Sequence, residues 1–146
     1  MGQAREVMDR LTEALTTTPD IKAIAELYAA DAVAVTPDGG EIHGRDNIVE
    51  YWRQMTDAIP EATYEPVYSY EIGNTAIDEG FFHGKNTGPI QLPSGESLPA
   101  TQKEIRIRGV DFATIDEDGR IASYRLYFDQ LDFLGQLGLL PEDLPA

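Results

Sequence analysis

The sequence contains no cysteine and only two histidines among its 146 residues. Without cysteine the chain forms no disulfides and offers no thiolate to a metal, which suits a reducing compartment, and we expect a cytoplasmic protein. His43 and His83 lie far apart in the sequence, whereas metal ligands must converge on one point. The sequence also lacks a glycine-rich phosphate loop and a Gly-x-Ser-x-Gly motif. We therefore expect neither a metal nor another cofactor.

Basic residues are scarce as well. Lys and Arg number 11 against 26 Asp and Glu, which gives a formal net charge of −15. Nucleic acids and anionic membrane surfaces are bound through a surplus of Lys and Arg, so neither is an expected partner. No stretch approaches the roughly 20 apolar residues that a membrane span requires. These absences favour a soluble protein.

The chain has the usual length of one domain, and we expect a single domain over residues 1–146. Apolar residues recur at helical spacing in three segments of the first half, which predicts three helices. These residues are Ala4, Val7, Met8, Leu11 and Leu15, then Ile21, Ile24, Ala25 and Tyr28, and then Ile48, Tyr51, Trp52, Met55 and Ile59. A short strand is expected at residues 32–35, between the second and third helices.

From residue 62 onward the period of the apolar residues changes to two, which is typical of strands. Strands are expected up to residue 72, over 76–86 and over 100–115, with Pro66 at an edge or bulge and a loop or hairpin tip over 87–98. The acidic turn Asp116–Gly119 joins the last of these strands to an aromatic strand that ends at Asp129. A short helix follows. The sequence therefore predicts an α+β fold with a mostly antiparallel sheet.

The segments YAADAVAVTPDGGEIHGRDNIVEYW and DEDGRIASYRLYFDQLDFLGQLG resemble the nuclear transport factor 2 superfamily, and within it the SnoaL-like polyketide cyclases and the limonene epoxide hydrolases. The resemblance covers nearly the whole chain. It implies a cone-shaped α+β barrel in which three N-terminal helices pack on the concave face of a curved, mostly antiparallel sheet. It also implies a homodimer formed through the outer faces of the sheets. Because this scaffold hosts several reactions and noncatalytic binders, it does not fix the chemistry.

The family resemblance assigns roles to particular positions. Epoxide hydrolases of this type have a water-activating Asp where this chain has Leu126, and ketosteroid isomerases have their general base where this chain has Thr36, so both reactions are disfavoured. Asp111 matches the isomerase position at which a carboxylic acid stays protonated in an apolar site. Asp129 aligns with an Asp of the cyclases, whereas Asn86 stands where many of them have His.

Asp111 is the leading catalytic candidate, because strand alternation turns it inward together with Ile107, and burial would raise its proton affinity. His83 and Asp129 are the assisting candidates. Each has a structural alternative: a hydrogen-bonded carboxyl for Asp111, a structural histidine for His83, and a helix N-cap for Asp129. The expected substrate-binding residues are Trp52, Tyr124, Phe128, Leu126, Met55, Ile107 and Asn86.

Two functions follow from these residues. As an enzyme, the chain would use acid/base catalysis to cyclise or isomerise a hydrophobic polyketide- or terpenoid-like molecule. As a binding module, the same pocket would hold an apolar ligand or a protein partner without turnover.

Overall fold

The computed structural model describes residues 2–92 and 94–140. Its elements in chain order are α1 (Gln3–Leu15), α2 (Ile21–Leu27), β1 (Tyr28–Thr36), β2 (Gly40–His43), α3 (Arg45–Ala58), β3 (Thr63–Ile72), β4 (Thr75–Lys85), β5 (Ile90–Gln91), β6 (Ser97–Leu98), β7 (Glu104–Ile115), β8 (Ile121–Phe128) and α4 (Gln130–Gln136). None of the described helices is both long and apolar enough to cross a membrane.

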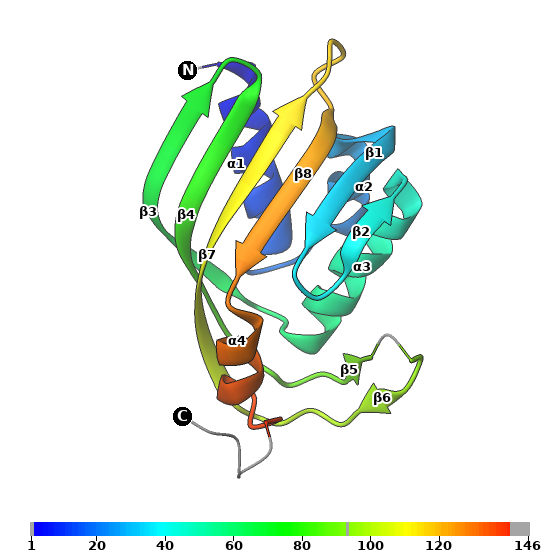
Figure 1. The fold of residues 1–146 in the computed structure, drawn as a ribbon, viewed down its shortest axis with the longest axis vertical. Coiled ribbons are helices and arrows are strands. Elements are labelled where there is room, and N and C mark those ends of the chain that lie inside the picture. The colour runs from blue at the N-terminus through cyan, green and yellow to red at the C-terminus, as the bar shows by residue number, and fades with distance from the viewer. Residues whose placement is uncertain (1, 93, 141–146) are drawn as a thin grey trace.

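Six strands form one curved sheet in the order β2-β1-β8-β7-β4-β3, and β5 pairs with β6 in a separate small ribbon. Neighbours in the large sheet are antiparallel except for β1 and β8, which run parallel. Figure 1 shows α1, α2 and α3 together on one face of this sheet, with α4 at the end of β8. The predicted α+β class is confirmed, with helices on the concave face. The sheet has free edges at β2 and β3 and does not close into a barrel.

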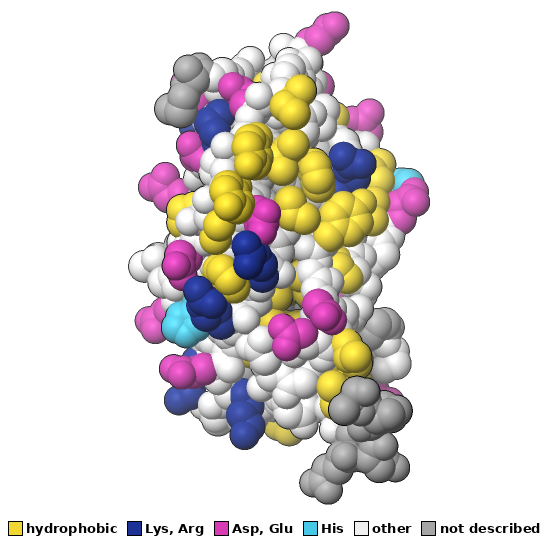
Figure 2. Space-filling view, turned by 60° about the vertical axis from the view of Figure 1, so that its left-hand side comes forward, with side chains coloured by type: hydrophobic (Ala, Val, Ile, Leu, Met, Phe, Trp, Pro, Cys, Tyr) yellow, Lys and Arg dark blue, Asp and Glu magenta, His cyan; other side chains and the backbone are white. Residues whose placement is uncertain are grey.

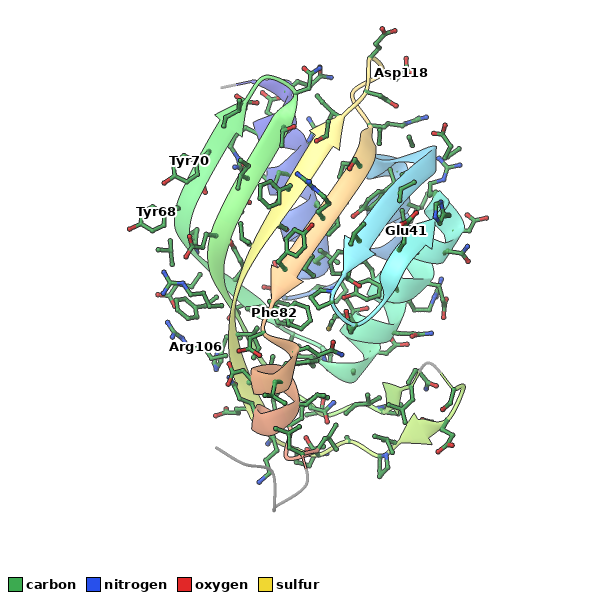
Figure 3. All side chains as sticks on the ribbon, viewed as in Figure 1. Glu41, Tyr68, Tyr70, Phe82, Arg106 and Asp118 are labelled. Atoms are coloured by element: carbon green, nitrogen blue, oxygen red, sulfur yellow. The ribbon has the colours of Figure 1, made fainter. Side chains whose placement is uncertain are left out.

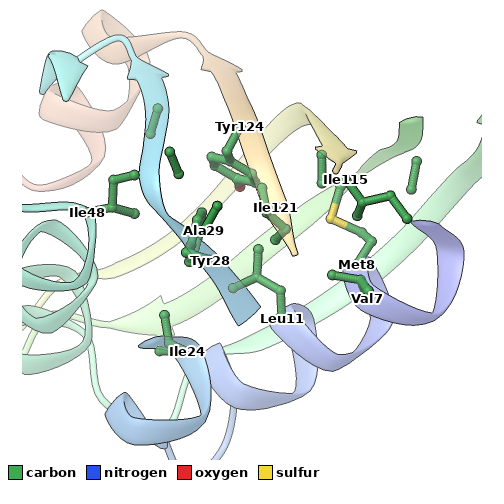
Figure 4. Close-up of a cluster of buried hydrophobic side chains, with 14 of the residues drawn as sticks. Val7, Met8, Leu11, Ile24, Tyr28, Ala29, Ile48, Ile115, Ile121 and Tyr124 are labelled. Carbon is green, nitrogen blue, oxygen red and sulfur yellow. The ribbon is translucent and has the colours of Figure 1, made fainter. Parts of the chain in front are cut away.

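The main core lies between α1, α2 and the sheet (Figure 4). The predicted apolar stripe of α1 is buried there, since Val7, Met8 and Leu11 are each at most 3% exposed. Spacings of three and four residues place these side chains on one face of the helix. A second, smaller cluster of buried side chains packs around Ile59 and Ile105 at the far end of α3. The two clusters leave a space between them.

Two boundaries and one strand differ from the sequence prediction. Tyr28 was expected on the second helix but begins β1, where it pairs with Ile121 of β8. The strand expected from residue 100 begins at Glu104, and β2, which pairs with β1, was not predicted. Pro66 lies as expected on an edge strand and beside a register shift. Pairing partners far away in the sequence decide these boundaries, and local patterns do not contain them.

Candidate active site

A cavity of about 110 Å³ lies between the two core clusters. Helices α1 and α3 supply one side of its wall and the inner face of the sheet supplies the other. The residues that line it are Thr12, Leu15, Thr16, Trp52, Met55, Thr56, Tyr64, Gly80, Phe82, Ile107, Gly109, Asp111, Tyr124, Leu126, Phe128 and Phe133. The wall is largely apolar, and Asp111 is the only ionisable carboxyl or amine in it.

Strand pairing explains why these residues meet. Gly80 of β4 lies opposite Gly109 of β7, and Asp111 lies opposite Leu126 of β8. Alternate residues of a strand point to the same face, so Ile107, Gly109 and Asp111 face the helices together. Gly80 and Gly109 add no side chains to the sheet side of the cavity wall, and the Tyr64 side chain lies against Gly80.

Asp111 has an environment that disfavours its charged form. Burial raises the pKa of its carboxyl to about 7, and the carboxylate of Asp78, which lies directly opposite on β4, acts in the same direction. The Tyr124 hydroxyl donates a hydrogen bond of 2.6 Å to Asp111 Oδ2 and, together with Arg5, opposes this rise of the pKa. Desolvation changes the pKa of Asp111 more than the hydrogen bond from Tyr124 and the charge of Arg5 do. Asp111 can therefore both release and accept a proton near neutral pH.

Aromatic rings hold the hydrogen-bonding partner of Asp111 in place. The ring of Tyr124 packs edge-on against Trp52, with centroids 5.6 Å apart, and against Tyr28 at 6.3 Å. The Trp52 indole N–H donates a 3.1 Å hydrogen bond to the Tyr28 hydroxyl. Burial and the charge of Asp111 raise the pKa of Tyr124, so its hydroxyl stays protonated and remains a donor. This cluster fixes the direction from which Asp111 is hydrogen bonded.

A buried ion pair lies behind the pocket wall. Arg5 Nη2 of α1 is 2.7 Å from Asp78 Oδ2, and both side chains are almost fully enclosed. Arg5 also contacts Asp9 at 2.9 Å. A buried charge is stable only when it is paired. Arg5 forms the ion pair with Asp78, whereas Asp111 has the hydrogen bond from Tyr124. The two neighbouring carboxyls thus have different partners.

Six of the seven expected substrate-binding residues line this cavity: Trp52, Met55, Ile107, Tyr124, Leu126 and Phe128. The seventh, Asn86, does not line it. Its side chain is fully buried and donates to the carbonyl oxygens of Ala58 and Gly88, while it accepts from the backbone N–H and the hydroxyl of Thr101. These bonds connect α3 with the loops on both sides of the β5–β6 ribbon, so Asn86 has a structural position.

The two assisting candidates lie away from the cavity. His83 is exposed on the outer face of β4, because the pairing with β7 runs without a register shift and alternation turns it away from Phe82. Asp129 is exposed at the start of α4, where its side chain accepts a 3.0 Å hydrogen bond from the backbone N–H of Asp132. The structure therefore brings neither of them to Asp111, and the N-cap alternative describes the contacts of Asp129.

Several lining residues were not predicted from the sequence, among them Tyr64 and Gly80, and neither was Asp78, the charged neighbour of Asp111. Tyr64 was recognised only as a strand residue, and Asp78 and Gly80 only as part of the strand expected over residues 76–86. An isolated glycine within a strand often marks the close approach of another group, and this signal was present at Gly80. The approach of Asp78 to Asp111 depends on the β4–β7 register, which local sequence does not contain.

A sequence profile of the SnoaL-like domain matches residues 8–124. No match was found among curated proteins.

Solved structures share the fold at low sequence identity. A proposed SnoaL-like polyketide cyclase from Jannaschia sp. CCS1 is 15% identical with a TM-score of 0.81, and the match covers 95% of this chain and 94% of that one. IdmH, a proposed polyketide cyclase from Streptomyces antibioticus, is 20% identical with a TM-score of 0.73, covering 94% and 99%. AclR, a proposed hydroxylase from Streptomyces galilaeus, is 16% identical with a TM-score of 0.77, covering 98% and 85%. These likenesses establish the fold, and their different names leave the reaction open.

Proposed function

Because the chain belongs to the SnoaL-like domain family, we propose that it is a cofactor-free enzyme that cyclises or isomerises a hydrophobic polyketide- or terpenoid-like substrate by acid/base catalysis. Asp111 is the proposed catalytic residue. The observation that carries this proposal is one hydrogen-bonded carboxyl in an apolar cavity, with its pKa raised to about 7. A general acid or base works best when its pKa lies near the working pH.

The proposed reaction begins with ionised Asp111, which removes a proton from a carbon next to a substrate carbonyl. In an isomerisation the same proton returns at another carbon of the conjugated system. In a cyclisation the new carbanion attacks a second carbonyl carbon, a C–C bond forms, and the alkoxide oxygen takes the proton from Asp111. Both sequences return Asp111 to its starting state. Tyr124 stabilises the ionised carboxylate through its 2.6 Å hydrogen bond.

The size of the cavity limits how much of a substrate it encloses. Its volume of about 110 Å³ is on the scale of an engineered apolar cavity of about 150 Å³ that holds benzene. The enclosed part of the substrate is therefore about one ring. We propose that the reacting ring lies beside Asp111 and that the rest of a larger substrate extends out of the cavity.

Asp111→Asn tests this function directly. With a panel of polyketide-, steroid- and terpenoid-like ketones, we expect turnover by the unmodified protein and a loss of about 10²-fold or more in kcat for Asp111→Asn, because the proton acceptor is removed. Ligand affinity should change much less. Asp129→Asn is the matched control, since it makes the same change outside the cavity and Asn is also a good N-cap.

Two results would count against the enzyme. If Asp111→Asn retained the turnover of the unmodified protein, Asp111 would not be its acid/base. If the panel bound without any conversion, the noncatalytic binding module would be the better description.

A further inference from the structure

The hydroxyl groups in the cavity wall differ in whether they already form a hydrogen bond within the protein. The hydroxyls of Thr12, Thr16 and Thr56 each donate to a carbonyl of their own helix, at 3.1, 2.8 and 3.1 Å. The Tyr124 hydroxyl donates to Asp111. These four hydroxyls are used within the protein.

The Tyr64 hydroxyl is different. It is buried and has no hydrogen-bond partner among the described residues, and Asp78 Oδ1 is the only other side-chain atom of that kind there. A donor withdrawn from water without a partner lowers the stability of the folded protein, so such groups are uncommon unless something else satisfies them. Tyr64 lines the cavity, where a ligand would supply a partner.

Gly80 determines where this hydroxyl lies. A Cβ atom at position 80 would overlap the Tyr64 hydroxyl and the Glu65 carbonyl oxygen, so only glycine lets the Tyr64 side chain lie across β4. Gly80 itself faces the cavity opposite Gly109. The Tyr64 hydroxyl therefore lies against Gly80, one of the residues that line the cavity.

The charges around the Tyr64 hydroxyl determine which kind of ligand group it could bind. Burial and the charges of Asp111 and Asp78 raise the pKa of Tyr64, which keeps its proton on the oxygen and makes it a donor. The same two carboxyls, and the net charge of −15, would repel an anionic ligand. A neutral oxygen acceptor, such as a ketone, can accept this hydrogen bond and is not repelled by the carboxylates.

We propose that the Tyr64 hydroxyl donates a hydrogen bond to a neutral carbonyl oxygen of the substrate and so orients it beside Asp111. Tyr64 is then a substrate-positioning residue that selects ketones over hydrocarbons of the same shape. This role rests on the proposed function only in assuming that the cavity binds the substrate, and it does not depend on turnover.

The experiment compares 1-tetralone with tetralin, which has the same rings without the carbonyl. Binding can be followed by fluorescence, because the only tryptophan of the chain, Trp52, lines the cavity. We expect the unmodified protein to bind 1-tetralone about 3- to 10-fold more tightly than tetralin, the size of one neutral hydrogen bond. In Tyr64→Phe this ratio should fall to about one, while tetralin affinity stays the same.

A second readout separates ligand binding from a structural role. If the hydroxyl has no protein partner, Tyr64→Phe should not lower the free energy of unfolding of the ligand-free protein. Tyr68→Phe, an exposed change on the same strand, is the matched control and should preserve both the stability and the ligand ratio. The Asp111→Asn turnover assay tests the function separately.

Three results would overturn the role of Tyr64. If neither probe bound, there would be no ligand site for these ketones. If the ratio of affinities were the same in Tyr64→Phe, the hydroxyl would not bind the carbonyl oxygen. If Tyr64→Phe destabilised the ligand-free protein and left the ratio unchanged, the hydroxyl would have a structural partner such as Asp78.

Discussion

Burial of Asp111 suits its carboxyl to acid/base catalysis, and it also makes the stability of the folded protein depend on pH. Its pKa is raised from 3.8 to about 7 in the folded protein, chiefly by burial. The folded state therefore holds a proton on Asp111 over a pH range in which the unfolded chain has already released it. Stability falls as pH rises wherever the folded state binds more protons than the unfolded state. The contribution of Asp111 to the free energy of unfolding is therefore most favourable at acidic pH, and it is lost as pH rises from about 4 through 7.

This linkage predicts a pH-dependent effect of Asp111→Asn on stability. Asn has no charge to desolvate, so the variant should gain stability relative to the unmodified protein as pH rises, by up to about 1.4 kcal/mol per pH unit between the two pKa values. Denaturant unfolding at several pH values between about 5 and 8 measures this. A difference that does not change with pH, or a variant that loses relative stability as pH rises, would contradict the raised pKa.

At the level of single residues, the position of Asp111 in the cavity could be predicted from the sequence, and that of Tyr64 could not. Asp111 lies two alternations beyond Ile107 on a strand whose inward face is evident from its apolar residues, so its direction follows from period two alone. The cavity position of Tyr64 depends on a glycine of the neighbouring strand and on the pairing register. His83 was a candidate because of its chemistry, and the register places it on the outer face.

At the level of elements, the long periodic segments were predictable and the short ones were not. The stripe of α1 and the β7–β8 hairpin were clear, because many residues repeat the same pattern there. Tyr28 fits the face of α2 by spacing, but pairing with β8 and the hydrogen bond from Trp52 place it in β1. The two-residue strands β5 and β6 pair antiparallel in the segment predicted as a loop or hairpin tip, but their positions were not predicted. Tertiary contacts decide such short elements.

Among the described residues, α1, α2 and α3 cover one face of the large sheet and leave its outer face open. The outer sides of β3, β4, β7 and β8 bear apolar side chains mixed with charged ones (Figure 2), and Tyr68 and Tyr70 project from β3 away from the ribbon (Figure 3). Tyr127 is 45% exposed there and packs edge-on against Phe112. Arg106 stacks over the Phe81 ring at 3.6 Å. Aromatic and arginine side chains together are enriched at protein interfaces.

We propose that this outer face forms a homodimer. Light scattering at micromolar concentration should give twice the chain mass of 16.1 kDa. Tyr127→Glu, which places a charge on this face, should shift the protein toward the monomer, because burying an unpaired charge is costly. Gln54→Glu adds the same charge on the exposed side of α3 and should leave the mass unchanged. A monomer for the unmodified protein would contradict the dimer.

The proposed acid/base role requires Asp111 to be a desolvated carboxyl that titrates near neutral pH. Carbon-13 NMR of the Asp carboxyls, with the Asp111 signal assigned by its loss in Asp111→Asn, measures its titration directly. We expect a midpoint at about 7, well above the 3.8 of an ordinary Asp. A midpoint at about 4 or below would show that Asp111 is ionised throughout the neutral range, and it would contradict the proposed acid/base role.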